Sequence, residues 1–151
     1  MKTQVAIVGA GPAGLFLAHL LKQQGIESVV LEARSREHVE ARVRAGVLEA
    51  GTIDTLNRLG LGERMAREGL VDKGLDIRFR GRTIHMDFPS LIGRNVCIYG
   101  QQEVVKDLVA ARLAAGDPLL FEAEVVRLER LETSSPRLHY RHQGTDKQLD
   151  C

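Results

Sequence analysis

The feature that most constrains this chain is a glycine-rich turn directly after its first apolar run. Residues 5–8 read Val-Ala-Ile-Val, and residues 9–14 read Gly-Ala-Gly-Pro-Ala-Gly. In a G-x-G-x-x-G turn between a strand and a helix, the first glycine makes the tight turn, the second lets a pyrophosphate approach, and the third packs helix on strand. The turn therefore predicts that amides at a helix N-terminus bind the phosphates of a dinucleotide.

The residues that follow the turn strengthen this prediction. Residues 15–24 have the apolar pattern of a helix that covers a sheet, and Gly25 ends it. A second apolar strand, 28–32, ends in Glu32, eighteen residues after Gly14. An acid about this far along binds the ribose hydroxyls in such folds. Each part alone is weak evidence, but together they predict an α/β fold, a Rossmann-like βαβ unit with a parallel sheet.

Composition places the chain among soluble globular proteins. Its net charge is +1, and 44% of its residues are hydrophobic and 27% charged. This balance lacks the basic excess of nucleic-acid-binding proteins. The uncharged stretch 5–21 is interrupted by glycines and is shorter than the ~20 residues of a spanning helix. The two cysteines, Cys97 and Cys151, form neither a CxxC motif nor a disulfide framework, which is typical of a protein in a reducing compartment. We expect a cytoplasmic protein without nucleic-acid or membrane partners.

An arginine-rich segment follows the second strand. Residues 33–44 contain Arg34, Arg36, Arg42 and Arg44, and an ordinary exposed loop is the alternative to a functional segment. Alternate spacing in an extended segment places Arg42 and Arg44 on one side, where their guanidinium groups suit a diphosphate. Gly46 would let the backbone approach a flat ligand.

The rest of the chain reads as a helix and several strands. Residues 47–59 have mostly helical spacing, and residues 75–79 and 83–87 alternate around 80–82 as a β-hairpin. Gln102 lies near the start of a helix over 103–113, where it could cap the helix or reach a ligand. Strands over 119–131 and 138–151 form a further meander. Because 147–151 reads as a strand that has just begun, we expect a truncated product or a fragment.

Four segments together carry a resemblance to a known family. They are the turn 9–14, Glu32, the run Arg-Val-Arg-Ala-Gly-Val-Leu-Glu at 42–49, and Tyr-Gly-Gln-Gln at 99–102. With them the chain resembles the N-terminal part of the single-component FAD-dependent aromatic hydroxylases, in particular those that hydroxylate 4-hydroxybenzoate. The resemblance covers residues 1–151 and well under half of a complete enzyme. It implies an incomplete FAD-binding domain without a substrate domain.

The resemblance implies a role for each matching position. The turn and Glu32 hold the ADP half of FAD, and Arg42 and Arg44 bind toward the diphosphate. The backbone at 45–47 lies beside the flavin ring, and Gln102 contacts the linker of FAD. The residues expected to bind FAD are Gly9, Gly11, Ala13, Gly14, Glu32, Arg42, Val43, Arg44, Ala45, Gly46, Val47 and Gln102. No residue of this segment is expected to be catalytic or to bind a metal.

The implied reaction is NAD(P)H-dependent hydroxylation of 4-hydroxybenzoate to 3,4-dihydroxybenzoate, by a complete enzyme that can form a homodimer. The segment after Glu32 influences the choice between NADPH and NADH in the family. His38 stands where better-known members carry an aromatic residue, which puts a preference for NADPH in doubt. The isolated chain is expected to bind FAD weakly or not at all and to hydroxylate nothing. Two alternatives are an NAD-dependent dehydrogenase domain and a non-catalytic fragment or binding module.

Overall fold

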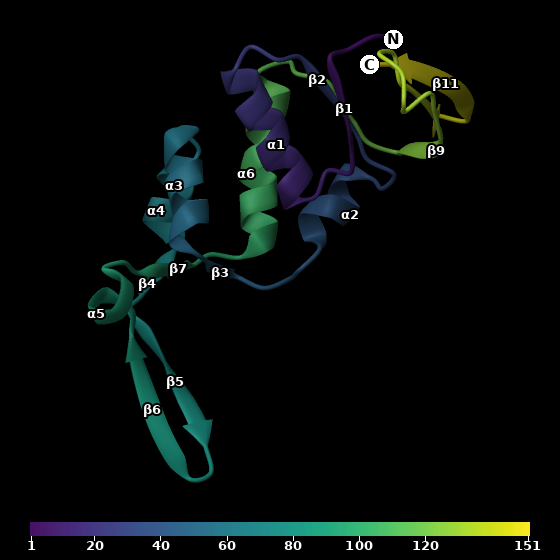
Figure 1. Cartoon of the computed structure of the whole chain (residues 1–151). Helices are drawn as coiled ribbons and strands as arrows, with labels where there is room; N and C mark the ends of the chain where they lie inside the picture. The colour runs from purple at the N-terminus through teal and green to yellow at the C-terminus, as the bar shows by residue number, and fades with distance from the viewer. The chain divides into compact units, whose positions relative to one another are not determined.

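The computed structural model describes residues 1–151 and divides them into two compact units (Figure 1). The first unit contains residues 1–42 and 102–151, and the second contains residues 43–101. The elements of the first unit are β1 (Val5–Val8), α1 (Pro12–Gln23), β2 (Ser28–Leu31), α2 (Arg36–Ala41), α6 (Gln101–Ala114), β8 (Leu119–Leu120), β9 (Ala123–Glu129), β10 (Arg137–His142) and β11 (Thr145–Asp150). Gln101, the first residue of α6, is assigned to the second unit. Those of the second unit are β3 (Val47–Leu48), α3 (Ala50–Arg58), α4 (Glu63–Glu68), β4 (Leu70–Asp72), β5 (Gly74–Phe79), β6 (Arg82–Asp87), α5 (Phe88–Ile92) and β7 (Val96–Ile98).

A parallel sheet of order β1-β2-β8 forms the centre of the first unit. Val5 lies opposite Ser28 and Val8 opposite Leu31, while Val30 pairs with Leu119. All four residues of β2 are buried. A central parallel strand is covered on both faces, which explains why its sequence is continuously apolar rather than alternating. The expected α/β fold with a parallel sheet is confirmed.

Helices α1 and α6 lie side by side in the first unit (Figure 1). Leu15 and Ala18 of α1 and Leu108 of α6 are fully buried. The Nε2–H of His19 donates to the carbonyl oxygen of Leu108 at 2.9 Å, which links the two helices. Burial lowers the pKa of His19, because the charged imidazolium loses its hydration there.

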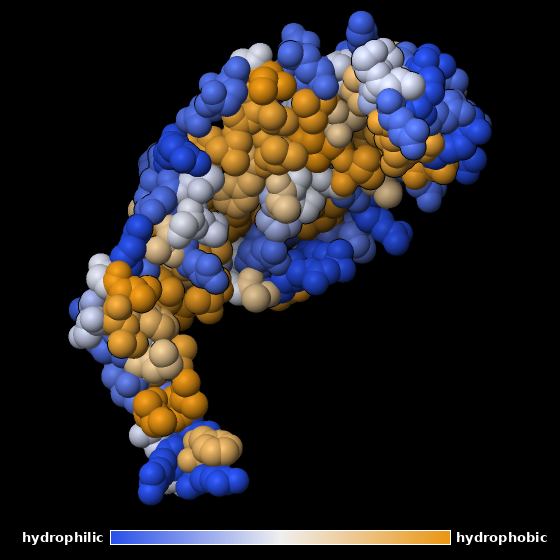
Figure 2. All heavy atoms as spheres, viewed as in Figure 1, coloured by the Kyte–Doolittle hydropathy of each residue, from blue (hydrophilic) through white to orange (hydrophobic).

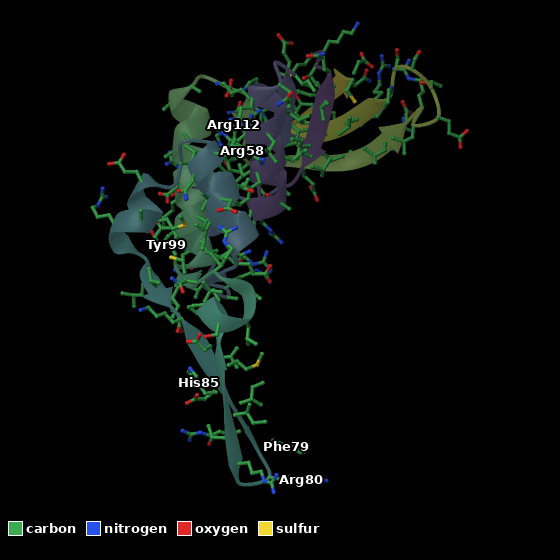
Figure 3. The ribbon with its side chains drawn as sticks, turned by 60° about the vertical axis from the view of Figure 1, so that its left-hand side comes forward. Arg58, Phe79, Arg80, His85, Tyr99 and Arg112 are labelled. Atoms are coloured by element: carbon green, nitrogen blue, oxygen red, sulfur yellow. The ribbon has the colours of Figure 1, made fainter.

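Arg112, near the end of α6, is the largest fully buried side chain and is labelled in Figure 3. Its Nη2 donates to the carbonyl oxygens of Ser28 (2.6 Å) and Pro118 (3.0 Å). Desolvation lowers its pKa. The guanidinium group thus joins α6 to the starts of β2 and β8, and its donors are satisfied by backbone carbonyls instead of a carboxylate.

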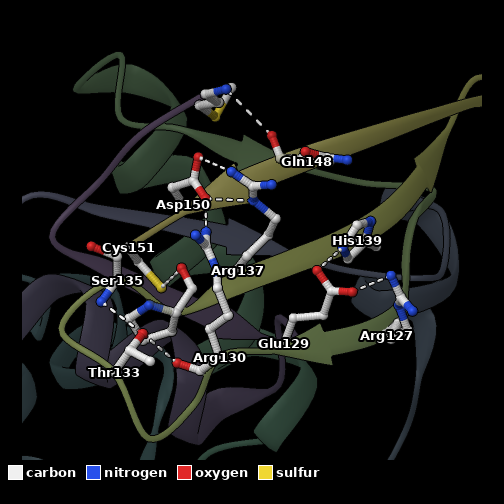
Figure 4. A network of polar contacts seen from close by, with 12 residues as sticks. Arg127, Glu129, Arg130, Thr133, Ser135, Arg137, His139, Gln148, Asp150 and Cys151 are labelled. Atoms are coloured by element: carbon white, nitrogen blue, oxygen red, sulfur yellow. Dashed lines mark hydrogen bonds and ion pairs between the residues drawn. The ribbon is translucent and has the colours of Figure 1, made fainter.

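An antiparallel sheet of order β11-β10-β9 completes the first unit. Val29 and Leu31 of β2 belong to one buried cluster with Leu138, Tyr140 and Leu149 of this sheet. At its surface Asp150 accepts hydrogen bonds from Arg130 and Arg137, both shown in Figure 4. The hydrogen bond from Arg137 is the main reason that the pKa of Asp150 is lowered.

The interpretation of 147–151 as a strand that has just begun is wrong. Strand β11 begins at Thr145 and pairs with β10 along its whole length, from Thr145 opposite His142 to Asp150 opposite Arg137. Gln143 and Gly144, both with positive φ, make the turn between the strands. The sequence prediction missed this hairpin because Gln-Gly is a weaker turn signal than Asn-Gly or Asp-Gly.

The second unit contains a sheet of order β3-β7-β4, with all pairs antiparallel. Leu56 of α3, Met65 of α4 and Cys97 of β7 are buried. The expected helix over 47–59 begins only at Ala50, because residues 47 and 48 form β3 and pair with Ile98 and Cys97. Local helical spacing was overruled there by strand pairing with a segment fifty residues away.

Strands β5 and β6 form the predicted hairpin, hereafter the ribbon. Arg80 and Gly81 connect them and both have positive φ, which suits a two-residue turn of type I′. Leu75, Ile77 and Phe79 share one face with Ile84, and all four are exposed. Figure 2 shows apolar surface along the ribbon, and Figure 3 shows Phe79 and Arg80 at its tip.

No helix of the chain combines the length and the apolar character needed to cross a bilayer.

Candidate functional site

The glycine turn leads from β1 into α1, as the sequence predicted. Gly9 has φ of +107°, a conformation that favours glycine, and its N–H donates to the carbonyl oxygen of Leu31 at 2.7 Å. Gly11 is the N-cap of α1, and Pro12 is the first residue of the helix. No side chain caps this end. The first amides of α1 are therefore available to an anionic ligand.

The second and third glycines of the turn serve different purposes. A Cβ at Gly14 would lie 2.3 Å from the carbonyl oxygen of Gly9 and 3.1 Å from Cγ2 of Ile7. Gly14 is thus required for the helix to pack on its own turn. A Cβ at Gly11 would meet nothing within 4 Å. The chain itself gives no reason for glycine at 11, and the space beside it is open, as the predicted approach of a pyrophosphate requires.

Glu32 lies beside this turn, just after β2. Its Oε2 accepts a hydrogen bond from the N–H of Ala10, and its Oε1 accepts one from the N–H of Arg34, both at 2.8 Å. The structure therefore brings together the two parts that the sequence predicted to hold the ADP half of a dinucleotide. The sequence did not predict the amide of Ala10 as part of this contact, because the glycine pattern carries no information about the residue between the first two glycines.

Gln102 is half-buried near the start of α6, and its Oε1 is a buried oxygen without a hydrogen-bond partner. Buried amide oxygens are nearly always paired. Of the two readings that the sequence left open, capping through this oxygen is not what the structure shows. An unpaired Oε1 of this kind suits a side chain that accepts a hydrogen bond from a bound ligand.

The arginine-rich segment after Glu32 is not a plain loop, because α2 forms within it. Ser35 is the N-cap and its Oγ accepts from the N–H of His38 at 3.3 Å, while Arg36 pairs with Glu40 at 2.6 Å. Arg42 follows the helix, is exposed and has no hydrogen-bond or ion-pair partner. The unpaired guanidinium group of Arg42 remains available for a phosphate.

The second unit holds the remaining expected residues, 43–47. The carbonyl oxygens of Ala45 and Gly46 accept hydrogen bonds from the N–H groups of Gln101 (3.2 Å) and Tyr99 (2.7 Å). A Cβ at Gly46 would lie 3.3 Å from Cα of Gly100. Such a contact is tight and would require Gly100 to shift by a few tenths of an ångström, so close packing on Gly100 favours glycine at 46, beside the approach to a flat ligand that the sequence suggested.

Residues 99–101 thus hold the backbone of Ala45 and Gly46, through hydrogen bonds from Tyr99 and Gln101 and close packing of Gly100. Tyr99 is buried under the guanidinium group of Arg64, which lies 5.7 Å from the centre of its ring. Val43 and Arg44 are exposed, and the guanidinium group of Arg44 has no partner in the chain. The sequence analysis used Tyr99 and Gly100 only as part of a resemblance. Their supporting role depends on the pairing of β3 with β7, which no local pattern reveals.

The expected binding residues therefore fall into two groups. The first unit holds the turn, Glu32, Arg42 and Gln102, and hydrogen bonds join Glu32 to the turn. The second unit holds residues 43–47 and the backbone that supports them.

Comparison with known proteins identifies what this arrangement resembles. The family described as FAD binding domain matches residues 2–151. The p-hydroxybenzoate hydroxylase of Acinetobacter baylyi (strain ATCC 33305 / BD413 / ADP1) is 40% identical over 152 aligned residues, which cover 100% of this chain and 37% of that protein. The 6-methylpretetramide 4-monooxygenase of Streptomyces rimosus is 36% identical over 71% of the chain and 26% of its own length. The chain thus spans little more than a third of the first relative and about a quarter of the second.

Solved structures agree with the sequence comparisons. The OxyS anhydrotetracycline hydroxylase from Streptomyces rimosus superposes with a TM-score of 0.85 at 25% identity, over 100% of this chain and 30% of that one. The p-nitrophenol 4-monooxygenase PnpA from Pseudomonas putida DLL-E4 superposes with a TM-score of 0.84 at 22% identity, over 99% of this chain and 39% of that one. It shows the same fold. The chain therefore belongs to the FAD binding domain family that flavin-dependent monooxygenases share.

Proposed function

We propose that the chain is the FAD-binding portion of an NAD(P)H-dependent flavoprotein monooxygenase, and that the complete protein hydroxylates 4-hydroxybenzoate to 3,4-dihydroxybenzoate. The observation that carries the proposal is the open space at Gly11 beside the carboxylate of Glu32. The choice of substrate is supported by the relative that is 40% identical across the whole chain. Residues 1–151 would then be an incomplete FAD-binding domain, with the substrate domain lying outside them.

The residues present fit FAD. In the first unit, the free amides at the start of α1 and the unpaired guanidinium group of Arg42 offer positive partners for two phosphates. Arg44, in the second unit, is also unpaired. Glu32 offers acceptors for the ribose hydroxyls, and the unpartnered Oε1 of Gln102 offers one for a donor of the ligand. When bound, the flavin would supply the redox and oxygen-transfer chemistry, while the protein supplies binding and orientation. An NAD-dependent dehydrogenase would need the turn and Glu32 but not the arginines at 42 and 44.

The electron donor is proposed to be NADH or NADPH, with α2 influencing the choice. Arg34, Ser35 and His38 line a pocket of about 530 Å³ together with Arg141 and Gln143. In a complete protein, replacing His38 with tyrosine is expected to change the ratio of the hydride-transfer rates from the two donors. Equal rate ratios before and after His38→Tyr would remove His38 from the choice of donor.

The FAD-binding proposal is tested by equilibrium dialysis of the purified chain against FAD, with NAD in parallel. Gly11→Ala is the informative variant, because its added methyl group meets no protein atom within 4 Å but occupies the expected phosphate position. Gly51→Ala is the matched control in α3, where the added methyl group is equally free. We expect weak FAD binding that Gly51→Ala keeps and Gly11→Ala weakens at least about tenfold. FAD binding that Gly11→Ala leaves unchanged would contradict the proposed site.

The hydroxylation proposal needs a separate assay. The purified chain, supplied with FAD, NADPH and 4-hydroxybenzoate, is expected to form no 3,4-dihydroxybenzoate, as measured by chromatography of the products. Formation of that product by the 151-residue chain would show that no further domain is needed.

A further inference from the structure

Both carboxylate oxygens of Glu32 are held by backbone amides of the chain itself. The N–H of Ala10 donates to Oε2 and that of Arg34 to Oε1, each at 2.8 Å. We propose that Glu32 is a positioning residue that holds the glycine turn in its phosphate-binding shape before any nucleotide is present. The identity of the nucleotide rests on the proposed function, but the bracing of the turn does not.

The burial of Ala10 makes this contact important. Ala10 has no exposed surface. Its N–H therefore has no access to water, and the carboxylate of Glu32 is its partner. A buried amide that loses its acceptor pays the full cost of desolvation, and more when the lost acceptor was charged. The turn is thus expected to change shape or open locally when the carboxylate is removed.

The turn is tied to the end of β2 through consecutive residues. The N–H of Gly9 donates to the carbonyl oxygen of Leu31 at 2.7 Å, and the next N–H, of Ala10, donates to Glu32. Neighbouring amides of the turn are thus held by neighbouring residues of one strand end. Since Gly11 follows directly as the N-cap of α1, these two contacts determine where the first amides of the helix point.

The backbone of Glu32 is itself fixed from the other side. Its N–H donates to the carbonyl oxygen of Leu120, and its carbonyl oxygen accepts from the N–H of Ala123, both at 2.8 Å. Glu32 therefore links the glycine turn to the strands β8 and β9. An ionised carboxylate offers about four acceptor positions, so two remain for the hydroxyl pair of a ribose. Bracing and sugar binding are compatible in one side chain.

The variant that tests the bracing is Glu32→Gln. The amide keeps the shape of the side chain but replaces one acceptor oxygen with an NH₂ donor, so one of the two backbone donors loses its partner. The matched control is Glu27→Gln, the same change at an exposed glutamate just before the opposite end of β2. The new NH₂ group faces either Ala10 or Arg34, so in the ligand-free chain we expect amide hydrogen exchange at one of these two residues to rise on the order of tenfold in Glu32→Gln and at neither in Glu27→Gln.

Two small ligands separate bracing from sugar binding. Inorganic pyrophosphate has phosphates but no sugar, and adenosine has a sugar but no phosphate. If Glu32 braces the turn, Glu32→Gln weakens both ligands, as followed by amide chemical shifts of the turn. If Glu32 binds only the sugar, adenosine binding weakens while pyrophosphate binding and the amide exchange of both Ala10 and Arg34 stay as in the wild type. The second result would overturn the proposal.

A measurement on the unmodified chain makes the proposal independent of whether the variant folds. A through-hydrogen-bond NMR coupling between the amide nitrogen of Ala10 and the side-chain carboxyl carbon of Glu32 is expected without ligand, and its absence would overturn the proposal. If this coupling is present but the wild type binds no pyrophosphate, the bracing stands and the phosphate site on which the proposed function rests fails. The two ideas therefore fail in different ways.

Discussion

Strand β2 is covered by the rest of the protein, whereas the ribbon of β5 and β6 is largely exposed to solvent. All four residues of β2 are buried between helices and a second sheet. No residue of the ribbon is fully buried, although its apolar side chains share one face. Both elements have the sequence of a β-strand. What differs is how many neighbours cover them.

The difference bears on where the proposed binding site is built. The end of β2 is fixed from both sides, and it carries Glu32 and receives the glycine turn. A binding site needs this rigidity, because amides and a carboxylate must be held in place to recognise phosphates and a sugar. The ribbon depends on its turn and on pairing between two strands, and an isolated pair of strands is only marginally stable in water.

The largest expected effect comes from a matched pair of leucines. Leu31→Ala in β2 removes a side chain with 1% exposure, so the free energy of unfolding should fall by about 2–5 kcal/mol. Leu75→Ala in the ribbon removes one with 44% exposure, and the loss should stay below about 1 kcal/mol. Urea denaturation followed by circular dichroism measures both. Equal losses would show that the ribbon is as well covered in solution as β2.

A single methyl group tests the packing of the turn on α1. The added Cβ of Gly14→Ala would lie 2.3 Å from the carbonyl oxygen of Gly9, so the first unit should lose roughly 1–3 kcal/mol of stability. Gly11→Ala is the matched control, because its Cβ has free space; as an N-cap change it should cost less than about 1 kcal/mol. Thermal unfolding of both variants and of the wild type measures the two losses of stability. Equal destabilisation by the two variants would contradict the distinct roles of the two glycines.

A smaller effect is expected at the turn of the ribbon. Gly81 has φ of +73°, which costs an L-residue about 1 kcal/mol, so Gly81→Ala should weaken the ribbon by that amount. The amides of β5 and β6 should then exchange faster, while those of β2 should not change, because the ribbon opens locally. Hydrogen exchange read by NMR measures both regions at once. Faster exchange in β2 as well would mean that ribbon and sheet unfold as one unit.

The smallest effect concerns pH. Burial lowers the pKa of His19 below its ordinary value of 6.5, so the folded chain favours the neutral imidazole. The unfolded chain then binds the proton more readily, and the contribution of His19 is complete above pH 6.5 and falls as the pH drops below it. His19→Gln, whose amide can still donate to Leu108, should remove this part of the pH dependence. Identical slopes of stability against pH for both proteins between pH 5 and 6.5 would contradict it.

The sequence predicted the parts of the molecule that depend on local patterns. The turn 9–14, the helix after it and the strand that ends at Glu32 were found from glycine spacing and apolar periodicity. The ribbon was found from its alternation around Arg-Gly. These signals lie within a few residues of one another, so no knowledge of the rest of the fold was needed.

The features that sequence reasoning missed depend on distant pairing. Residues 47 and 48 became a strand because β7 pairs with them, and the hairpin of β10 and β11 was hidden by a weak turn signal. The contact of Ala10 with Glu32 spans 22 residues, and the unpartnered oxygen of Gln102 depends on burial that no pattern reports. The site was thus predicted as a set of residue types, while its internal hydrogen bonds were not.

The most direct test of the central claim is a map of where FAD binds on the labelled chain, from amide chemical shifts during titration with FAD up to millimolar concentration. The account predicts that the largest shifts occur at residues 9–13 and at Glu32, that they are lost in Gly11→Ala, and that the ribbon amides stay unchanged. Shifts that spare the turn and Glu32 in the folded chain, or that survive Gly11→Ala unaltered, would contradict it.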